Sequence, residues 1–404
     1  MTTARFDYTS PEIAGPKFWD AVGELRGLGP LVWVEDSGGY WAATSYDMIL
    51  RIAQDWQTFS SGDGVALSRP SFEAIPRMVP LELDPPRHRA FRRQVNPALT
   101  VKAISPLEDE IRAIADELID GFVARGECDL AVDFARKFPG TVFFRLIAHC
   151  TDEDFRQAEP AARQISFESD DKEKFAAAAA RLRAWAARVF ESREAQPGQP
   201  EQPKPSEADL VDALMHLEDG GAEFADHEHL TGLQILAQGG IGTSASVIGS
   251  VMLALCEDRE LQQRVREEPS LIPSVVEEVL RMEAPVPIMF RTARADVEIG
   301  GQRIRKGDKV CLIFGAAGRD PAVFGDPGRL DLERPHCRHL TFGAGVHRCI
   351  GSNLARLQIR VAIQQLVTRL GEFRLPDGAE VAYSSRQSRG PVSIPLEFTP
   401  RSRA

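Results

Sequence analysis

The chain has 404 residues, of which 43% are hydrophobic and 26% charged, so it is long enough for one large or two to three ordinary globular domains and is neither disordered nor fibrous. Its 48 Lys and Arg against 59 Asp and Glu give a net charge of −11, which disfavours a nucleic acid partner. The start has no apolar leader, and no uninterrupted apolar run approaches the roughly 18 residues of a membrane helix. With six cysteines that lack CxxC spacing, we expect a cytoplasmic protein without membrane association.

Helical periodicity dominates the first three quarters of the chain. Residues 106–124 place apolar side chains at three- and four-residue steps, and residues 172–194 continue in the same way. Four prolines within 196–205 then exclude helix and indicate a domain linker or a surface loop.

The pattern changes after about residue 285. Residues 286–314 alternate and turn at Gly300 and Gly301, which predicts short strands. A helix is expected after Cys349, and strands return near 392–398. Because helices cluster apart from small sheets, the predicted class is mainly α with a minor β part.

The most informative segment is 342–351, a glycine-rich loop around Cys349 that precedes a predicted helix. Gly343 and Gly351 allow the backbone to approach a flat ligand, and the start of the helix favours a thiolate over a thiol. A thiolate at this place is a metal ligand or a nucleophile. The alternative is an ordinary buried thiol in a glycine-rich loop.

The loop resembles the FGxGxHxCxG haem-binding loop of the cytochrome P450 monooxygenases, with every specified position present. The resemblance implies a large helical lobe and a small β-rich lobe around a buried haem b. It also implies that Cys349 is the axial iron ligand, that Phe342 lies beside the sulfur, and that His347 reaches a haem propionate. The implied organisation is a single haem domain over 1–404 with no fused reductase.

Three further segments match the family in the right order. Glu278 and Arg281 form an ExxR motif, and the resemblance pairs them with Arg334 in a structural role. The resemblance also makes His88, Arg92 and Arg291 propionate ligands. Taken alone, His88 and Arg92 are better explained as a basic solvated face, and Glu278 and Arg281 as a surface ion pair.

A glycine-rich helix segment around 239–244 resembles the family's oxygen-activation helix. The resemblance aligns Thr243 with the threonine that helps to deliver protons to dioxygen, and it places Gly242 where an acidic residue is expected. The chain would then use water, Ser244 or another side chain. The alternative for Thr243 is a hydroxyl that bonds back to a carbonyl one turn earlier.

Two other sites compete with haem. Residues 240–245 satisfy the GxGxxA dinucleotide fingerprint, although no strand is expected before them. A zinc site is the second alternative, and its candidate ligands are His336, Cys337, His339, His347 and Cys349.

The resemblance therefore implies a monooxygenase that inserts one oxygen atom from dioxygen into a small hydrophobic substrate. As in the family's soluble bacterial-type members, electrons would come from a separate ferredoxin with an NAD(P)H-dependent reductase. We expect this donor to dock on a face made basic by Arg89, Arg93, Arg348 and Arg356. The expected substrate positions, besides 72–78, are Leu236, Gly239, Gly240, Val286, Ile288, Met289 and Val392. The alternatives are peroxide-using or non-hydroxylating chemistry such as coupling, dehydration or group transfer, and a non-enzymatic haem or ligand sensor.

Overall fold

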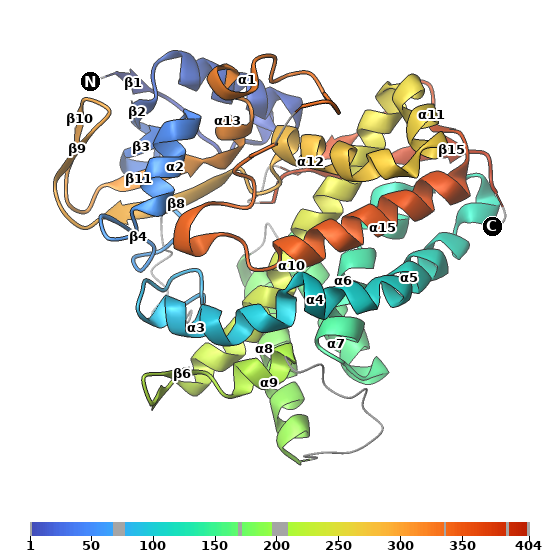
Figure 1. The fold of residues 1–404 in the computed structure, drawn as a ribbon, viewed down its shortest axis with the longest axis horizontal. Helices are drawn as coiled ribbons and strands as arrows, with labels where there is room; N and C mark the ends of the chain where they lie inside the picture. The colour runs from blue at the N-terminus through green and yellow to red at the C-terminus, as the bar shows by residue number, and fades with distance from the viewer. Residues whose placement is uncertain are drawn as a thin grey trace.

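The computed structural model describes residues 2–67, 77–168, 172–195, 209–334, 337–384 and 388–401. They form two lobes, each with its own hydrophobic core (Figure 1). The α-helices are α1 (Pro16–Gly27), α2 (Tyr46–Gln54), α3 (Arg87–Val95), α4 (Val101–Ile104), α5 (Glu108–Asp120), α6 (Phe138–Val142), α7 (Asp152–Arg163), α8 (Lys172–Ala195), α9 (Leu210–Met215), α10 (Asp226–Glu257), α11 (Arg259–Glu267), α12 (Ile272–Glu283), α13 (Phe314–Gly318), α14 (Pro321–Phe324) and α15 (Ser352–Leu370). The strands are β1 (Thr3–Ala4), β2 (Leu31–Val34), β3 (Tyr40–Ala43), β4 (Phe59–Ser60), β5 (Glu127–Asp129), β6 (Glu218–Asp219), β7 (Ala222–Glu223), β8 (Ile288–Ala293), β9 (Val297–Ile299), β10 (Gln302–Ile304), β11 (Lys309–Ile313), β12 (Phe373–Arg374), β13 (Ala382–Tyr383), β14 (Pro391–Ser393) and β15 (Pro395–Phe398).

The small lobe is built on a six-stranded sheet in the order β1-β2-β3-β11-β8-β4. The late strands β11 and β8 lie between the early strands β3 and β4, and Figure 1 shows blue strands beside orange ones. Strand β11 is parallel to β3 and antiparallel to β8, so it is paired on both edges. Its residues Val310 to Ile313 are all buried, as expected for an apolar run at the centre of a covered sheet.

The large lobe is helical, and α10 runs through its centre in contact with α6, α8, α12 and α15. The apolar segment of α10 is long enough to span a membrane, but two-thirds of it is buried inside the protein. A helix that is apolar on all sides and surrounded by other helices is a core helix.

The predicted fold class is confirmed, and the periodic segments became the expected elements. The helix predicted over 106–124 is α5, and the one predicted over 172–194 is α8. Strands β9 and β10 form a hairpin across Gly300 and Gly301. Of the four-proline segment 196–205, no residue lies among those described.

Candidate active site

Helix α3 presents His88 and Arg92 toward the cysteine loop, and ion pairs hold the start of this helix in place. Arg87 makes two hydrogen bonds, of 3.0 and 2.8 Å, to Glu228 in the first turn of α10. The side chain of Asp84 accepts from Ser60 rather than capping α3. His88 is buried, and the Arg92 guanidinium donates to a main-chain carbonyl of the cysteine loop.

Two histidines from distant segments meet between the lobes. The rings of His88 and His347 have centroids 4.2 Å apart, and His88 Nδ1 and His347 Nε2 are buried without a hydrogen-bond partner. Burial lowers the pKa of His88 to about 4, and burial with the neighbouring charges of Arg291, His88 and Arg92 lowers that of His347 to about 2. The cluster is rich in N–H donors, and the one carboxylate that acts on His88 and Arg291, that of Asp84, is itself bound to Arg294 and Ser60.

The cysteine loop closes on itself through its backbone. The Cys349 N–H donates to the Phe342 carbonyl at 2.7 Å, and Gly343 has a φ of 71° that favours glycine. At Gly345 a Cβ atom would lie 2.4 Å from the carbonyl oxygen of Ala53, so glycine is needed there for close approach to α2.

Cys349 is exposed to solvent by surface area, but its thiol is surrounded by protein atoms on most sides. Burial raises the pKa of its thiol, and the Gly351 N–H together with the charges of Arg92, Arg348 and Arg356 only partly oppose that effect. The Gly351 N–H at the start of α15 thus favours the thiolate, as expected, but burial outweighs its effect on the pKa. A bound metal ion would be needed to hold this sulfur as a thiolate.

Helix α10 is continuous through its glycines. Nothing lies within 4 Å of a Cβ atom built on Gly239 or Gly240, so both face open space. The Thr243 hydroxyl donates to the Gly239 carbonyl at 2.8 Å, one turn earlier. The Ser244 hydroxyl is buried against α15, where it accepts from Gln358 at 2.8 Å.

The position expected to carry an acid is enclosed by two serines. A Cβ atom on Gly242 would lie 3.4 Å from Cβ of Ser166 and 3.4 Å from Oγ of Ser388. The Ser388 hydroxyl is buried and has no hydrogen-bond partner among the described residues. Neither serine was identified from the sequence, because each lies far from Gly242 along the chain.

The ExxR motif forms a buried network. Arg281 donates to both carboxylate oxygens of Glu278 at 2.9 and 3.0 Å, and Arg334 reaches the same carboxylate at 3.2 Å. Burial would raise the pKa of Glu278, but the hydrogen bonds from Arg281 and from the Asp331 N–H lower it on balance. A fully buried arginine held in this way fixes α12 to the segment before the cysteine loop.

The expected substrate positions divide into two groups. Along β8, Met289 and Arg291 share one face by alternation, whereas Ile288 is 7% exposed and packs in the core of the small lobe. Its place in a substrate pocket stays a prediction. Leu236, Val286 and Val392 are half-buried, and of the segment 72–78 the structure describes only residues 77 and 78.

The residues that the structure describes form neither competing site. Residues 240–245 lie inside α10, with no strand before them, so the dinucleotide fingerprint is excluded. Within the described ranges, which omit His336, there is no group of three His, Cys, Asp or Glu side chains that could hold a metal ion. Cys337 and His339 instead contact Glu278 and Glu277.

These residues fit a haem. Partnerless histidine nitrogens and the buried Arg291 suit two propionate groups, the glycines of α10 leave space, and Cys349 offers an accessible sulfur. A family model described as "Cytochrome P450" matches residues 160–382. The chain belongs to the cytochrome P450 family. The predicted family is thereby confirmed.

Known P450 proteins resemble the whole chain. Steroid C26-monooxygenase of Mycolicibacterium smegmatis is 30% identical over 90% of this chain and 89% of its own length. Linalool 8-monooxygenase of Pseudomonas putida is 29% identical over 90% and 93%. The crystal structure of cytochrome P450 CYP101C1 superposes with a TM-score of 0.88 at 28% identity, covering 98% of this chain and 97% of that one. The predicted enzyme class, a P450 monooxygenase, is confirmed.

Sequence reasoning missed part of the P450 site. Glu277, directly before the ExxR glutamate, binds Arg356 and His339, and both of these contact Phe342. The available signal was the doubled Glu277–Glu278, but nothing in a sequence pattern joins it to residues some 60 and 80 positions later.

Proposed function

We propose that this P450 is a haem-thiolate monooxygenase that inserts one oxygen atom from dioxygen into a small hydrophobic molecule. The observation that carries the proposal is the accessible Cys349 sulfur in a closed loop beside the partnerless histidine cluster. When bound, the haem would supply oxygen activation, and thiolate donation from Cys349 would favour cleavage of the O–O bond. The protein supplies position, charge and exclusion of water.

Four residues would bind the two propionates of haem b. His88 and His347 would share protons with these carboxylates, and Arg92 and Arg291 would neutralise them. Arg291 is buried and its guanidinium donates to the neighbouring Phe290 carbonyl, so a carboxylate there would satisfy further donors of the guanidinium. Gly343 and Gly351 would let the loop backbone approach the ring.

Thr243 would hold a proton near dioxygen. Its hydroxyl now donates to the Gly239 carbonyl, and a rotation would turn it toward the open space beside Gly239 and Gly240. The carboxylate that is missing at Gly242 would be replaced by water held at the Ser388 hydroxyl rather than by Ser244, which is engaged with Gln358.

The substrate would be an apolar molecule such as a terpenoid, an aromatic or a fatty compound. Met289 on the Arg291 face of β8, with Leu236, Val286 and Val392, offers mainly apolar contacts beside the glycines of α10. The names of two relatives, a steroid and a linalool monooxygenase, agree with that class. Binding can be screened by the spin-state change of the haem absorption spectrum.

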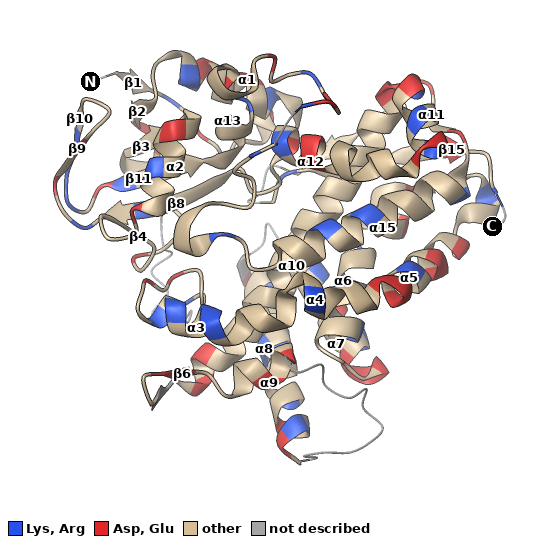
Figure 2. Ribbon diagram, in the orientation of Figure 1, with Lys and Arg blue, Asp and Glu red and all other residues tan. Residues whose placement is uncertain are grey.

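A separate ferredoxin with an NAD(P)H-dependent reductase would deliver the electrons in the cytoplasm. Arg89, Arg93 and Arg348 are exposed near the cysteine loop, and the blue segments of α3 in Figure 2 mark part of this face. Arg356, in contrast, is half-buried and bound to Glu277, so it is less available to a docking partner. Charge reversal at Arg89 and Arg93 should slow reduction at low salt, and unchanged rates would remove this docking face.

The absorption spectrum of the reduced protein with carbon monoxide tests the central proposal. Thiolate ligation gives a red-shifted Soret band, and Cys349→Ala should lose it. A protein that binds no haem after adequate supply would overturn the proposal.

A second function has one observation in its favour. The missing acid at Gly242 suits chemistry that uses peroxide or removes hydrogen without inserting oxygen. Product formation that requires an electron donor and dioxygen would separate the monooxygenase from this alternative. Ligand-dependent binding of a partner protein without any turnover would instead identify a sensor.

A further inference from the structure

The ring of Phe342 contacts two polar side chains, those of Arg356 and His339. The guanidinium carbon of Arg356 lies 4.4 Å from the ring centroid, in cation–π geometry. The ring of His339 lies with its centroid 5.7 Å away. Since the Phe342 carbonyl accepts from the Cys349 N–H, the position of Phe342 and that of the cysteine backbone are coupled.

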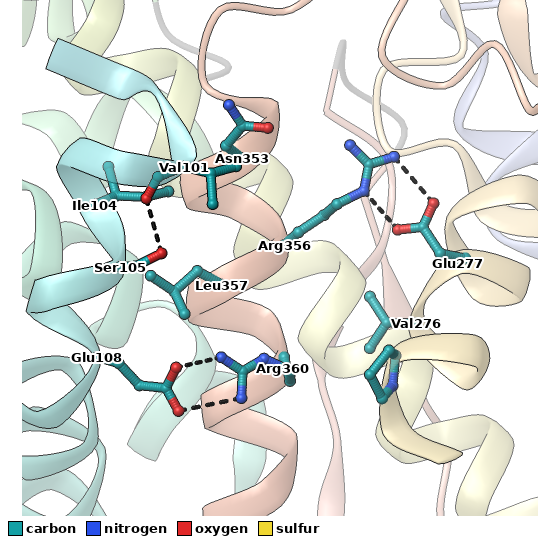
Figure 3. A pocket seen from close by; sticks show the side chains of 11 residues that line it. Val101, Ile104, Ser105, Glu108, Val276, Glu277, Asn353, Arg356, Leu357 and Arg360 are labelled. Carbon is teal, nitrogen blue, oxygen red and sulfur yellow. Dashed lines mark hydrogen bonds and ion pairs between the residues drawn. The ribbon is translucent and has the colours of Figure 1, made fainter. Parts of the chain in front are cut away.

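One carboxylate holds both of those side chains. Glu277 accepts from Arg356 Nε at 2.6 Å and from its terminal nitrogen at 2.9 Å, and its second oxygen lies 3.2 Å from His339 Nε2. Figure 3 shows Arg356 reaching from α15 across to Glu277 on α12. Burial would raise the pKa of Glu277, but the hydrogen bonds from His339 and Arg356 lower it to about 2, so the carboxylate is ionised at neutral pH.

We propose that Arg356, held by Glu277, is a positioning residue for Phe342 and Cys349 and thereby sets the reduction equilibrium of a haem iron bound at that sulfur. The inference rests on the proposed function, because it requires a thiolate-ligated haem. The physical reason is twofold: the guanidinium fixes the ring beside the sulfur, and its positive charge favours the more negative, reduced state of the site.

The chain contains a matched control for this pair. One turn further along α15, Arg360 also donates two hydrogen bonds to a single carboxylate. It bonds to Glu108 on α5 at 3.2 and 2.5 Å. Both pairs line the same groove of about 350 Å³, as Figure 3 shows. Within the part of the chain that the structure describes, Arg360 makes no ring contact with Phe342 and is not among the charges that act on the Cys349 thiol, so it lacks both features that the inference requires.

The test is a spectroelectrochemical titration of the purified holoprotein. In Arg356→Met we expect the ferric-to-ferrous equilibrium to shift about tenfold toward the ferric form, which is about 59 mV for one electron. Arg360→Met should leave the equilibrium unchanged. Arg356→Lys keeps the charge but not the planar two-bond geometry, so it should restore only part of the shift.

The overturning result is an Arg356→Met potential equal to that of the wild type and of Arg360→Met. If Arg356→Met does not fold, Arg356→Gln carries the same expectation, since it removes the charge but can still bond to Glu277. A wild-type protein without the thiolate carbonyl spectrum would refute the proposed function. A normal spectrum with an unmoved potential would refute this inference alone.

Discussion

Gly318 lies where α13 crosses the end of α12, and its missing side chain is needed there. A Cβ atom would lie 2.1 Å from the carbonyl oxygen of Arg281, a distance that backbone atoms cannot accommodate without moving. We expect Gly318→Ala to destabilise the protein by about 3 kcal/mol, measured by urea unfolding. Gly23→Ala in α1 meets nothing within 4 Å and should instead add about 0.5–1 kcal/mol. Equal stability of the two variants would contradict the explanation.

An acidic side chain can be introduced at position 242. The new Cβ would make ordinary contacts at 3.4 Å with Ser166 and Ser388, and the carboxylate could accept from the Ser388 hydroxyl. Gly242→Asp should therefore fold and should raise the amount of product formed per electron consumed, at the expense of hydrogen peroxide. Adding Ser388→Ala should reduce that gain. No change in the product-to-peroxide ratio would indicate that proton delivery does not pass this position.

Local sequence was enough to find the cysteine loop, because its glycines and Cys349 lie within ten residues. Local sequence was not enough to predict the pKa of the Cys349 thiol. The pKa of Cys349 depends on burial and on Arg92 and Arg356, which fold in from different helices. The same reason hid Ser388, which only the tertiary structure brings to Gly242.

At the scale of elements, Glu277 and Arg356 join α12 to α15. The pKa of Glu277 falls from its usual 4.5 to about 2, so the carboxylate contributes stability that is complete above about pH 4.5 and is lost as the pH falls toward 2. We estimate about 2 kcal/mol for this contribution, given partial exposure. Between pH 5 and 3, the free energy of unfolding in urea should fall more steeply with decreasing pH for the wild type than for Glu277→Gln. Parallel pH dependences of the two proteins would contradict this contribution.

Periodicity predicted α5, α8 and the β9–β10 hairpin because each has its own apolar pattern and turn. It did not predict how strands pair. β3 and β11 are far apart along the chain, and their parallel register is set by the core of the small lobe rather than by either strand's sequence. The contribution of Arg87 and Glu228, which fixes α3 against α10, was missed for the same reason.

The whole molecule has two cores, and the cysteine loop joins them. Leu340 and Ala344 belong to the core of the small lobe, and Leu354, just after Cys349, belongs to the core of the large lobe. A haem bound between them would contact both lobes through Arg291 on β8 and His88 on α3.

Haem should therefore couple the unfolding of the two lobes. We expect calorimetry of the haem-free protein to show two transitions and that of the haem-bound protein to show one transition at a higher temperature. His88→Ala with Arg291→Ala should weaken the coupling by removing a contact from each lobe. A single transition at the same temperature in both states would contradict this view of the lobes.

The interleaved order of the small-lobe sheet also has a consequence for biosynthesis. Strand β3 leaves the ribosome early, but its neighbour β11 ends only at Ile313, so the sheet cannot close until most of the polypeptide has been translated. The helical-lobe segments between β3 and β11 emerge before β11 and can begin to associate. Meanwhile the edge of β3 that will pair with β11 stays exposed. The nascent chain thus carries an unpaired edge at β3 from the time that β3 emerges until β11 has been made.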